Sequence, residues 1–261
     1  HGTVLGHRFL GIILRKMVQN EIKFTYVTLF EKQKGLINLF EKFGFSPWGV
    51  KENGELVYFK DDTAHSDLYK DFPKINLKSN NKSYLLSIYP KYHTLLFPDS
   101  RLNTERSHVI EDLSFTNTTE KIYLTRISQV ADISIGDLIV IYRTREENMS
   151  AEYSSVATSI CSVLEVKNIS DFKNQDEFMS YCSKGTIFTQ DELNSFWKSK
   201  KYPHIIKMLY NVPLNKRIIR KRLIEEIGMD RDAYWGFIDL TDDQIRDIIE
   251  IGEVSEGFII D

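Results

Sequence analysis

The chain of 261 residues has two cysteines and no long apolar run. Cys161 and Cys182 are isolated from each other, so we expect free thiols rather than a disulfide or a metal site. The longest apolar runs are only a few residues, which excludes a membrane-spanning helix. Apolar and basic residues are interleaved near the N-terminus, and no secretory signal peptide is recognisable. These absences favour a cytoplasmic protein without a membrane partner.

The six histidines are scattered and show no metal-ligand spacing with the cysteines, so we expect no metal. A net charge of −3 argues against a surface that coats nucleic acid uniformly, but it is compatible with a local basic patch. No internal repeat or low-complexity tract is present. With 42% hydrophobic and 27% charged residues, the chain is typical of a globular protein. Its length favours two domains.

Residues 1–60 predict a helix, a strand, a second helix and a hairpin. Apolar residues at helical spacing indicate a helix over 8–20, and the β-branched and aromatic residues 24–30 indicate a strand. A second amphipathic helix is expected over 32–43, ending before Gly44. The hairpin over 48–60 would turn at Asn53–Gly54, the strongest short hairpin signal. Residues 61–83 are polar and without sustained periodicity, which is typical of a linker.

The segments "GHRFLG", "LFEKFGFSPWG" and "ELVYFK" resemble the C-terminal half of a GNAT-type N-acetyltransferase. In that superfamily a glycine-containing loop opens a helix and holds acetyl-CoA. Backbone N–H groups at a helix start suit the pyrophosphate of this cofactor. The resemblance therefore implies acetyl-CoA binding by Gly6, His7, Arg8, Phe9, Leu10 and Gly11.

Two residues depart from the acetyltransferase pattern. Phe9 stands where the family has a glycine, and Phe40 stands where it often has a tyrosine that acts as general acid. A phenylalanine has no proton to give, so we expect Phe40 to pack rather than act, and no catalytic residue is assigned. The first four strands of the family fold would precede residue 3. The chain therefore resembles a piece of a longer protein.

Residues 84–255 predict an α+β domain that follows the partial GNAT-like α/β unit. Strands are expected over 121–125, 136–143 and 154–166, in one strongly curved sheet or barrel, and helical patterns follow farther along the chain. The sequences "KIYLTRISQVADISIGDLIVIYRT" and "SSVATSICSVLEV" resemble the core of a PUA-like barrel, the group that includes ASCH, EVE and YTH domains. The resemblance implies a β-barrel with helical decoration that binds RNA, modified bases or nucleotide-like ligands.

The same resemblance places Tyr142, Arg143 and Thr144 at the mouth of the barrel, with Tyr123, Phe188 and Trp197 as candidates for an aromatic pocket wall. Side chains alternate along a strand, so Tyr142 and Arg143 should point to opposite faces. We expect Arg143 to face the ligand, because a barrel interior would reject its charge. Core packing is the alternative role for each aromatic residue.

The run "NKRIIRKRL" is a candidate phosphate-contacting patch, and "KSKK" at 198–201 adds another basic cluster. The basic residues of the run are Lys216, Arg217, Arg220, Lys221 and Arg222. A solvated helix face beside acidic neighbours is the alternative interpretation. His93 has no nucleophilic or acidic partner in the sequence pattern, and we expect a structural role for it.

Two hypotheses follow from these patterns. The first is an acetyl-CoA-dependent N-acetyltransferase with a PUA-like module that selects an RNA or nucleotide-linked acceptor. The second is a catalytically inactive GNAT-like scaffold that carries an RNA or modified-base reader. Phe9 and Phe40 weigh against the first hypothesis. The acetyl acceptor and the oligomeric state stay open.

Overall fold

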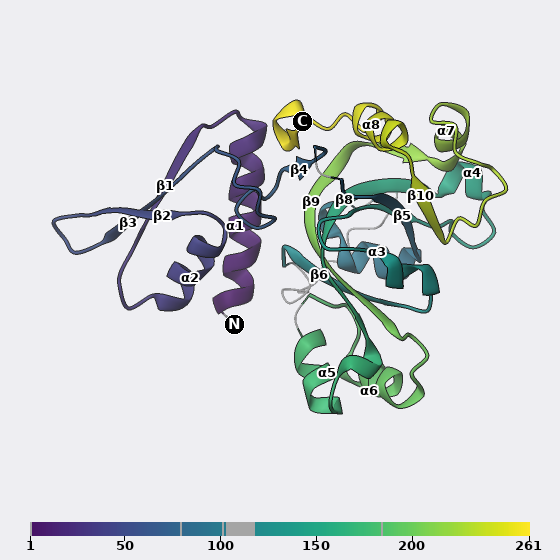
Figure 1. Cartoon of the computed structure of the whole chain (residues 1–261), viewed down its shortest axis with the longest axis horizontal. Coiled ribbons are helices and arrows are strands. Elements are labelled where there is room, and N and C mark those ends of the chain that lie inside the picture. The colour runs from purple at the N-terminus through teal and green to yellow at the C-terminus, as the bar shows by residue number, and fades with distance from the viewer. Residues whose placement is uncertain (1, 79, 101, 103–117, 184) are drawn as a thin grey trace. The chain divides into compact units, whose positions relative to one another are not determined.

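The computed structural model describes residues 2–78, 80–100, 102, 118–183 and 185–261 (Figure 1). The chain divides into two compact units. Unit 1 spans residues 1–79 and 255–261, and unit 2 spans residues 80–254. None of the described helices has both the length and the apolar character that crossing a membrane requires.

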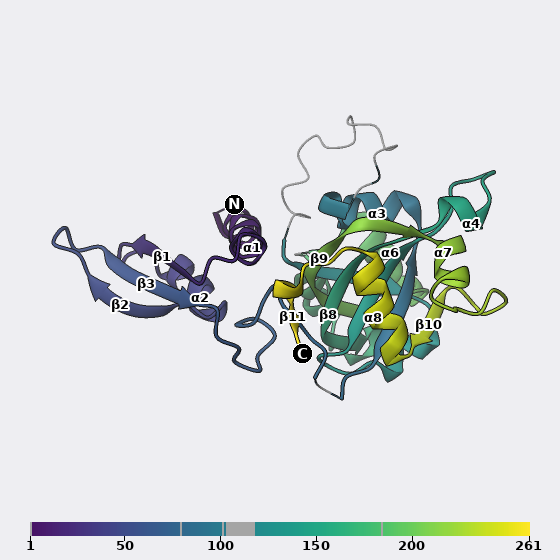
Figure 2. The same cartoon turned by 90° about the horizontal axis from the view of Figure 1, so that it is seen from above.

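Unit 1 has the predicted order of helix, strand, helix and hairpin over its first sixty residues. Its elements are α1 (Gly2–Gln19), β1 (Phe24–Leu29), α2 (Lys34–Lys42), β2 (Ser46–Val50), β3 (Leu56–Asp61), β4 (Ile75–Asn76), the 3₁₀ helix η5 (Glu256–Phe258) and β11 (Ile259–Ile260). The first three strands form an antiparallel sheet in the order β1-β3-β2 (Figure 2). The hairpin turns where the sequence predicts, with Gly54 at φ +81°. β4 and β11 pair in parallel.

The stretch Gly6–Gly11 lies inside α1 rather than at its start, because the helix begins at Gly2. Each backbone N–H group in a helix interior bonds to the carbonyl four residues earlier, so these groups are not open to an anion. A Cβ atom on Gly6 would lie 3.4 Å from the side chains of Leu36 and Leu39, so this position faces α2. The predicted helix start at this stretch is therefore wrong.

The other side chains of that stretch also have structural positions. Leu10 and Gly11 are buried, Arg8 and Phe9 are exposed, and the His7 ring lies 6.1 Å from that of Phe43. Acetyl-CoA binding by these residues stays a prediction.

Phe40 is half-buried, and its ring contacts that of Phe45 edge to face with centroids 4.9 Å apart. This contact agrees with the expected packing role.

Residues 61–78, expected within a linker, pack in unit 1. Asp62 forms an ion pair with Lys74 at 2.6 Å, and the Asp71 carboxylate accepts backbone hydrogen bonds within the loop. Phe72 and Ile75 are fully buried. The polar side chains of this segment satisfy a folded loop, which is why polarity alone did not distinguish it from a linker.

Unit 2 is built on one six-stranded sheet. Its elements are β5 (Ser83–Ile88), α3 (Pro90–Leu96), η1 (Pro98–Ser100), β6 (Glu120–Thr125), η3 (Ser128–Asp132), β7 (Leu138–Arg143), α4 (Ala151–Ser154), β8 (Val156–Asn168), η4 (Ile169–Asp171), α5 (Gln175–Cys182), α6 (Gln190–Ser199), β9 (His204–Ile219), α7 (Arg220–Glu225), β10 (Phe237–Leu240) and α8 (Asp242–Ile251). The strand order is β10-β5-β7-β8-β9-β6, with β5 and β7 parallel and the other pairs antiparallel.

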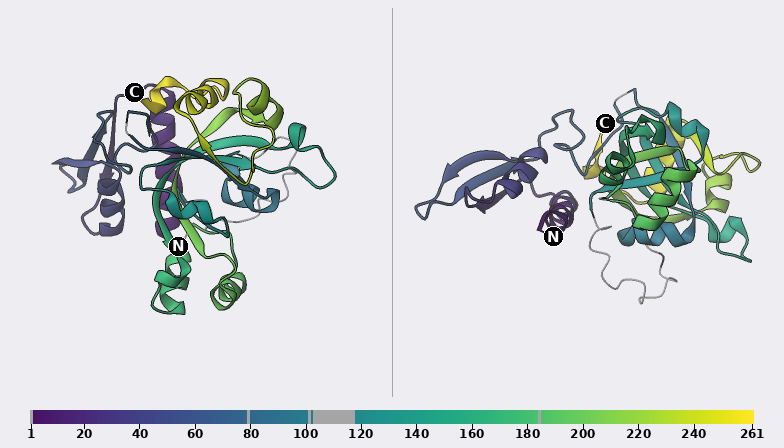
Figure 3. Two further views of the ribbon diagram at one scale, coloured as in Figure 1. Left: turned by 45° about the vertical axis from the view of Figure 1, so that its right-hand side comes forward. Right: turned by 90° about the horizontal axis from the view of Figure 1, so that it is seen from below.

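The expectation that the strands near 121–125, 136–143 and 154–166 share one sheet is confirmed. The sheet does not close into a barrel, because the edge strands β10 and β6 do not pair with each other in the described part of the chain. Apolar residues of the sheet pack against α3, α5 and α6. Helices α5 and α6 lie together at one end of the long β8–β9 ribbon (Figure 3). Cys161 and Cys182 are both buried in this interior and form no disulfide, as expected.

Candidate functional site

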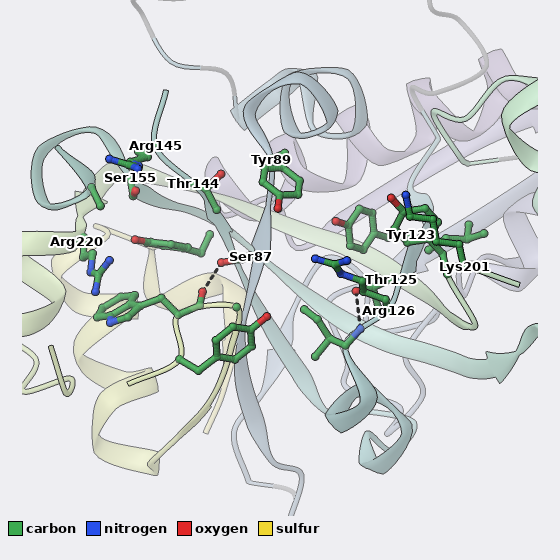
Figure 4. Close-up of a pocket in the computed structure, with 18 residues that line it drawn as sticks. Ser87, Tyr89, Tyr123, Thr125, Arg126, Thr144, Arg145, Ser155, Lys201 and Arg220 are labelled. Atoms are coloured by element: carbon green, nitrogen blue, oxygen red, sulfur yellow. Dashed lines mark hydrogen bonds between the residues drawn. The ribbon is translucent and has the colours of Figure 1, made fainter. Parts of the chain in front are cut away.

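Unit 2 contains a cavity of about 600 Å³ at one end of its sheet (Figure 4). This volume lies within the range of about 300–1,000 Å³ that is typical of small-molecule sites. The lining residues come from β5, β6 and β7, from the first residues of α4 and α7, and from the loops around β8, β9 and β10. They are Ser87, Tyr89, Tyr123, Leu124, Thr125, Arg126, Ile127, Tyr142, Thr144, Arg145, Ala151, Ser155, Lys201, Tyr202, Arg220, Tyr234, Trp235 and Gly236.

The bent β8–β9 ribbon brings distant parts of the chain to this cavity. Lys201 lies just before β9 and Arg220 lies just after it, yet both line the cavity. A straight strand of this length would span roughly 50 Å at about 3.3 Å per residue, so β9 must curve strongly. The pairing of β8 with β9 shifts register at three places, and such bulges bend a strand and increase its twist.

Tyr142 and Trp235 form an aromatic wall at one end of the cavity. Their ring centroids are 5.4 Å apart and their planes are inclined by 42°. Ser87 fixes the Trp235 loop to β5: its backbone N–H donates to the carbonyl of Gly236 at 3.0 Å, and its hydroxyl donates to the carbonyl of Trp235. The Trp235 indole N–H donates to the carbonyl of Arg231 at 3.2 Å. This wall is therefore held in place before any ligand arrives.

Further tyrosines line the cavity. Tyr123 is buried on β6, and its burial raises the pKa of its hydroxyl. Tyr89 and Tyr234 are exposed by 62% and 66%, so their rings stand at the rim. Aromatic faces at the wall and the rim provide stacking surfaces for a planar ligand.

Four cationic side chains line the cavity, and none of its 18 lining residues is acidic. They are Arg126, Arg145, Lys201 and Arg220, and none of them forms an ion pair with an acidic side chain of the described chain. Arg145 donates to the carbonyl of Met149 at 3.1 Å, and Arg220 donates to that of Arg231 at 3.0 Å. The Arg220 guanidinium also lies 4.2 Å from the centre of the Trp235 ring. This arrangement favours an anionic ligand.

Three polar atoms of the lining are buried and make no hydrogen bond within the described chain: the hydroxyls of Tyr142 and Thr144 and Nε of Arg220. Burial raises the pKa of the Tyr142 hydroxyl, although Ser155 and Arg220 nearby offset part of the rise. A buried polar group without a partner costs free energy, so such groups next to a cavity are suited to a ligand's donors and acceptors.

The structure brings three of the predicted pocket residues together at the cavity: Tyr123, Tyr142 and Thr144. Tyr142 and Arg143 point to opposite faces of β7, as strand alternation predicts, but Tyr142 rather than Arg143 lines the cavity. Arg143 is 1% exposed and forms an ion pair with Glu146. Its charge adds to the effect of burial, which lowers the pKa of His93 to about 3. His93 is itself buried and bonds to Thr158 at 2.8 Å, a structural position.

Phe188 and Trp197 lie away from the cavity. The Phe188 ring contacts those of Tyr92 and Phe196 at centroid distances of 5.4 and 5.1 Å. Trp197 stacks on Phe178 at 5.5 Å. Both residues serve packing around α5 and α6, which is the alternative role that aromatic content favours.

The basic run divides between two elements rather than forming one helix face. Lys216 and Arg217 belong to β9, and α7 begins at Arg220. Most of its cations have partners: Lys216, Lys221 and Arg222 pair with glutamates at 3.6, 3.9 and 2.6 Å, and Arg217 donates to the carbonyl of Asp99 at 3.3 Å. Only Arg220 of this run lines the cavity.

Sequence reasoning missed two of the four cations, Arg126 and Arg145, and four aromatic residues of the site, which are Tyr89, Tyr202, Tyr234 and Trp235. Arg126 follows the predicted strand 121–125 directly, and Lys201 belongs to the cluster "KSKK". Tyr234 and Trp235 lie in "DAYWGF", where two large aromatic residues precede a glycine in a polar loop. Such a cluster outside a periodic segment is a signal that could have identified this wall. No group of histidine, cysteine and acidic side chains in the described ranges could hold a metal ion.

No protein-family model and no curated protein matches the chain. Similar solved structures include an ASCH protein from Zymomonas mobilis, 9% identical over 65% of this chain and 95% of that chain, with a TM-score of 0.42. A hypothetical protein from Leishmania major is 11% identical over 67% of this chain and 96% of that chain, with a TM-score of 0.38. The N-terminal domain of Thermococcus gammatolerans McrB, bound to m5C DNA, is 10% identical over 66% of this chain and 98% of that chain, with a TM-score of 0.37.

An ASCH protein is thus among the structural neighbours, and the sequence of residues 84–255 resembles the PUA-like group to which ASCH domains belong. None of these three structures supports the acetyltransferase resemblance of residues 1–60. Likenesses of this size carry no argument about function, which must come from the cavity itself.

Proposed function

We propose that unit 2 binds nucleic acid and takes one nucleotide into the cavity of Figure 4. One observation carries the proposal: the cavity combines aromatic faces with four cations that lack acidic partners in the described chain, and its lining holds no acidic residue. A nucleotide has the matching chemistry, with a planar base and a phosphate.

Stacking supplies the first part of this interaction. The rings of Tyr142 and Trp235 lie against each other within the cavity, and Tyr89 and Tyr234 stand at its rim. Base–aromatic stacking is worth roughly 1–3 kcal/mol per base and tolerates any sequence. Such stacking needs an unpaired base, so the ligand is a single strand or a nucleotide displaced from a duplex.

Phosphate contacts supply the second part. Arginine guanidinium groups donate to phosphate oxygens in charge-assisted, often bidentate pairs. Arg126 and Arg145 are exposed and can reach a strand that passes over the rim, whereas Arg220 is half-buried beside Trp235. The unpartnered hydroxyls of Tyr142 and Thr144 are available to polar atoms of the base or the sugar.

Acetyl transfer is not part of the proposed function. The stretch expected to hold acetyl-CoA lies inside α1, and Phe40 cannot donate a proton. Of the two hypotheses from the sequence, the binding protein agrees better with these positions.

The test compares two arginines that are two residues apart. Fluorescence anisotropy measures binding of labelled single-stranded RNA and DNA of about ten nucleotides to the full chain. Arg220→Gln should weaken binding about tenfold or more, since a hydrogen bond to a charged group contributes roughly 1.5–3 kcal/mol. For this variant, the slope of the logarithm of the binding constant against the logarithm of the salt concentration should also become shallower. The expected change is about 0.7 for each phosphate group that the variant no longer neutralises.

Arg222→Gln is the matched control, because Arg222 is engaged by Glu226 through two hydrogen bonds of 2.6 Å and lies outside the cavity. This variant should bind as the wild type does. Equal losses in the two variants would show diffuse attraction to the basic run, and no binding by the wild type would refute the proposal.

A further inference from the structure

The four cations of the cavity stand in two groups at opposite ends of it. Arg145 and Arg220 lie at one end beside Ser155, and Arg126 and Lys201 lie at the other (Figure 4). Ser87, Tyr89 and Thr144 lie between the two groups in the same view. The curvature of β9 accounts for the arrangement, because Lys201 and Arg220 flank its two ends.

Neither end is neutralised from within the described chain. Arg126 has no hydrogen-bonding or acidic partner there, and Lys201 makes only a cation–π contact with Tyr202, whose ring centre is 5.6 Å from Nζ. The guanidinium groups at the other end donate only to backbone carbonyls of the described residues. A ligand with a single anionic group would therefore leave one cationic end without a partner.

Aromatic rings accompany both ends and the space between them. Tyr142 and Trp235 form the wall at the end that holds Arg220, Tyr123 lies beside Lys201 at the other end, and Tyr89 lies between the two groups (Figure 4). A ligand that matches this arrangement has one anionic group for each end and a planar group that can stack on these rings. Two adjacent phosphates on one side of a nucleoside do not match it, because both would lie at the same end.

Resting on the proposed function, we infer that the cavity selects a nucleotide with a phosphate on each side of its sugar. The 5′-phosphate and the 3′-phosphate bind at opposite cationic ends, the sugar lies between them, and the base, which branches from the sugar, stacks on aromatic residues of the lining. Two sources provide this chemistry: an internal nucleotide of a single strand and a free nucleoside 3′,5′-bisphosphate. A terminal nucleotide that lacks one phosphate is disfavoured.

Isothermal titration of the full chain tests the inference with ligands matched in phosphate number. Adenosine 3′,5′-bisphosphate and adenosine 5′-diphosphate share the base, the sugar and two phosphates, and differ in where the second phosphate is attached; the uridine pair is the second set. The bisphosphates should bind at least about tenfold more tightly than the diphosphates, which corresponds to about 1.4 kcal/mol. Equal or tighter binding of the diphosphates would overturn the inference.

Variants at each cationic end test which phosphate binds there. We compare Arg126→Gln combined with Lys201→Gln, both on exposed side chains, with Arg145→Gln, also on an exposed side chain. Each variant should bind the bisphosphate about tenfold more weakly or worse. With monophosphates, one variant should lose affinity for the 5′-monophosphate and the other should lose affinity for the 3′-monophosphate. Weaker binding of the same monophosphate in both would overturn the inference, because all the cations would then act on one phosphate.

The outcomes also separate this inference from the proposed function. Oligonucleotide binding that depends on Arg220, together with equal affinities for the bisphosphate and the diphosphate, would retain the proposed function and overturn the inference. Tight bisphosphate binding without oligonucleotide binding would support the two-ended site and refute the proposed function. An oligonucleotide that competes with the bisphosphate for the cavity would support both.

Discussion

Removing one oxygen atom from the cavity wall should weaken ligand binding without destabilising the fold. The Tyr142 side chain is 2% exposed, and its hydroxyl makes no hydrogen bond within the described chain. Tyr142→Phe keeps the ring against Trp235 and deletes only the hydroxyl. The variant therefore separates the role of this group toward a ligand from its role in packing.

Tyr142→Phe should leave the stability of the fold unchanged or raise it, and it should lower the affinity for the ligand. A buried polar group without a partner costs roughly 1–3 kcal/mol, so its removal should leave the free energy of unfolding unchanged or raise it by up to about 1 kcal/mol. For a unit of this size that corresponds to at most about 4 °C in Tm. A ligand that accepts or donates a hydrogen bond at this hydroxyl would lose about 0.5–1.5 kcal/mol, which is roughly 2- to 13-fold in Kd.

Thermal unfolding and anisotropy with a single-stranded oligonucleotide measure the two quantities. Tyr181→Phe is the control, because the Tyr181 hydroxyl donates to Glu165 at 2.8 Å outside the cavity. That variant should lose about 1–2 kcal/mol of stability and keep its affinity. If Tyr142→Phe loses stability as Tyr181→Phe does, or if its affinity equals that of the wild type, the reasoning about the unpartnered hydroxyl is refuted.

Three further predictions concern stability, each measured by urea unfolding. Burial lowers the pKa of His93 to about 3, below its ordinary value near 6.5, so the unfolded chain binds a proton that the folded chain does not. Stability therefore rises with pH across this window, and from about pH 7 to about pH 5 this residue alone should lower it by about 2 kcal/mol. His93→Gln should remove that part of the slope while exposed His65→Gln keeps it, and identical slopes in all three proteins would contradict the prediction. Phe43→Ala should lower the stability of unit 1 by roughly 3–5 kcal/mol, because the ring is fully buried and meets two other aromatic rings at 5.5 Å; a loss below about 1 kcal/mol would count against that packing. Gly185→Ala should cost more than about 1 kcal/mol, since Gly185 has φ +85° and an added Cβ would lie 2.6 Å from the carbonyl oxygen of Glu120, and an unchanged urea midpoint would exclude this strain.

Local patterns predicted the elements of unit 1 well, but they did not identify where its first helix begins. The strand, the second helix and the Asn53–Gly54 turn follow from periodicity and turn chemistry. Gly6 and Gly11 suggested a helix start because glycine is common where the backbone binds anions. In the structure Gly6 lies within α1 and faces Leu36 and Leu39 of α2, and a single sequence carries no signal that separates this position from a helix start.

The faces of β7 show what alternation can and cannot establish. Alternation places Tyr142 and Arg143 on opposite faces, and the structure agrees. Choosing the face that meets the ligand required a further premise, that an interior rejects the arginine charge. All six residues of β7 are buried, and Arg143 is accommodated by an ion pair with Glu146 three residues later. A local partner therefore offset part of the cost on which the choice depended.

The basic run illustrates a longer-range dependence. Counting charges gave Lys216, Arg217, Arg220, Lys221 and Arg222 equal weight, whereas only Arg220 lines the cavity. What selects it is the end of β9: the strand stops at Ile219, and the next residue opens α7 at the cavity. The cations that act with it come from other loops, at positions no charge count would join.

The curvature of the β8–β9 ribbon is therefore the property on which the site depends most. Its bulges lie between Ala157 and Ser159, between Ile160 and Cys161, and between Val163 and Glu165, and Pro213 of β9 pairs with Ser159 beside the first of them. Proline cannot donate a ladder hydrogen bond, so it is tolerated at such an irregularity. Straightening the ribbon would separate Lys201 from Arg220 while leaving each side chain intact. Affinity for a ligand that bridges both ends should hence be more sensitive to changes at these bulges than affinity for a ligand held at one end.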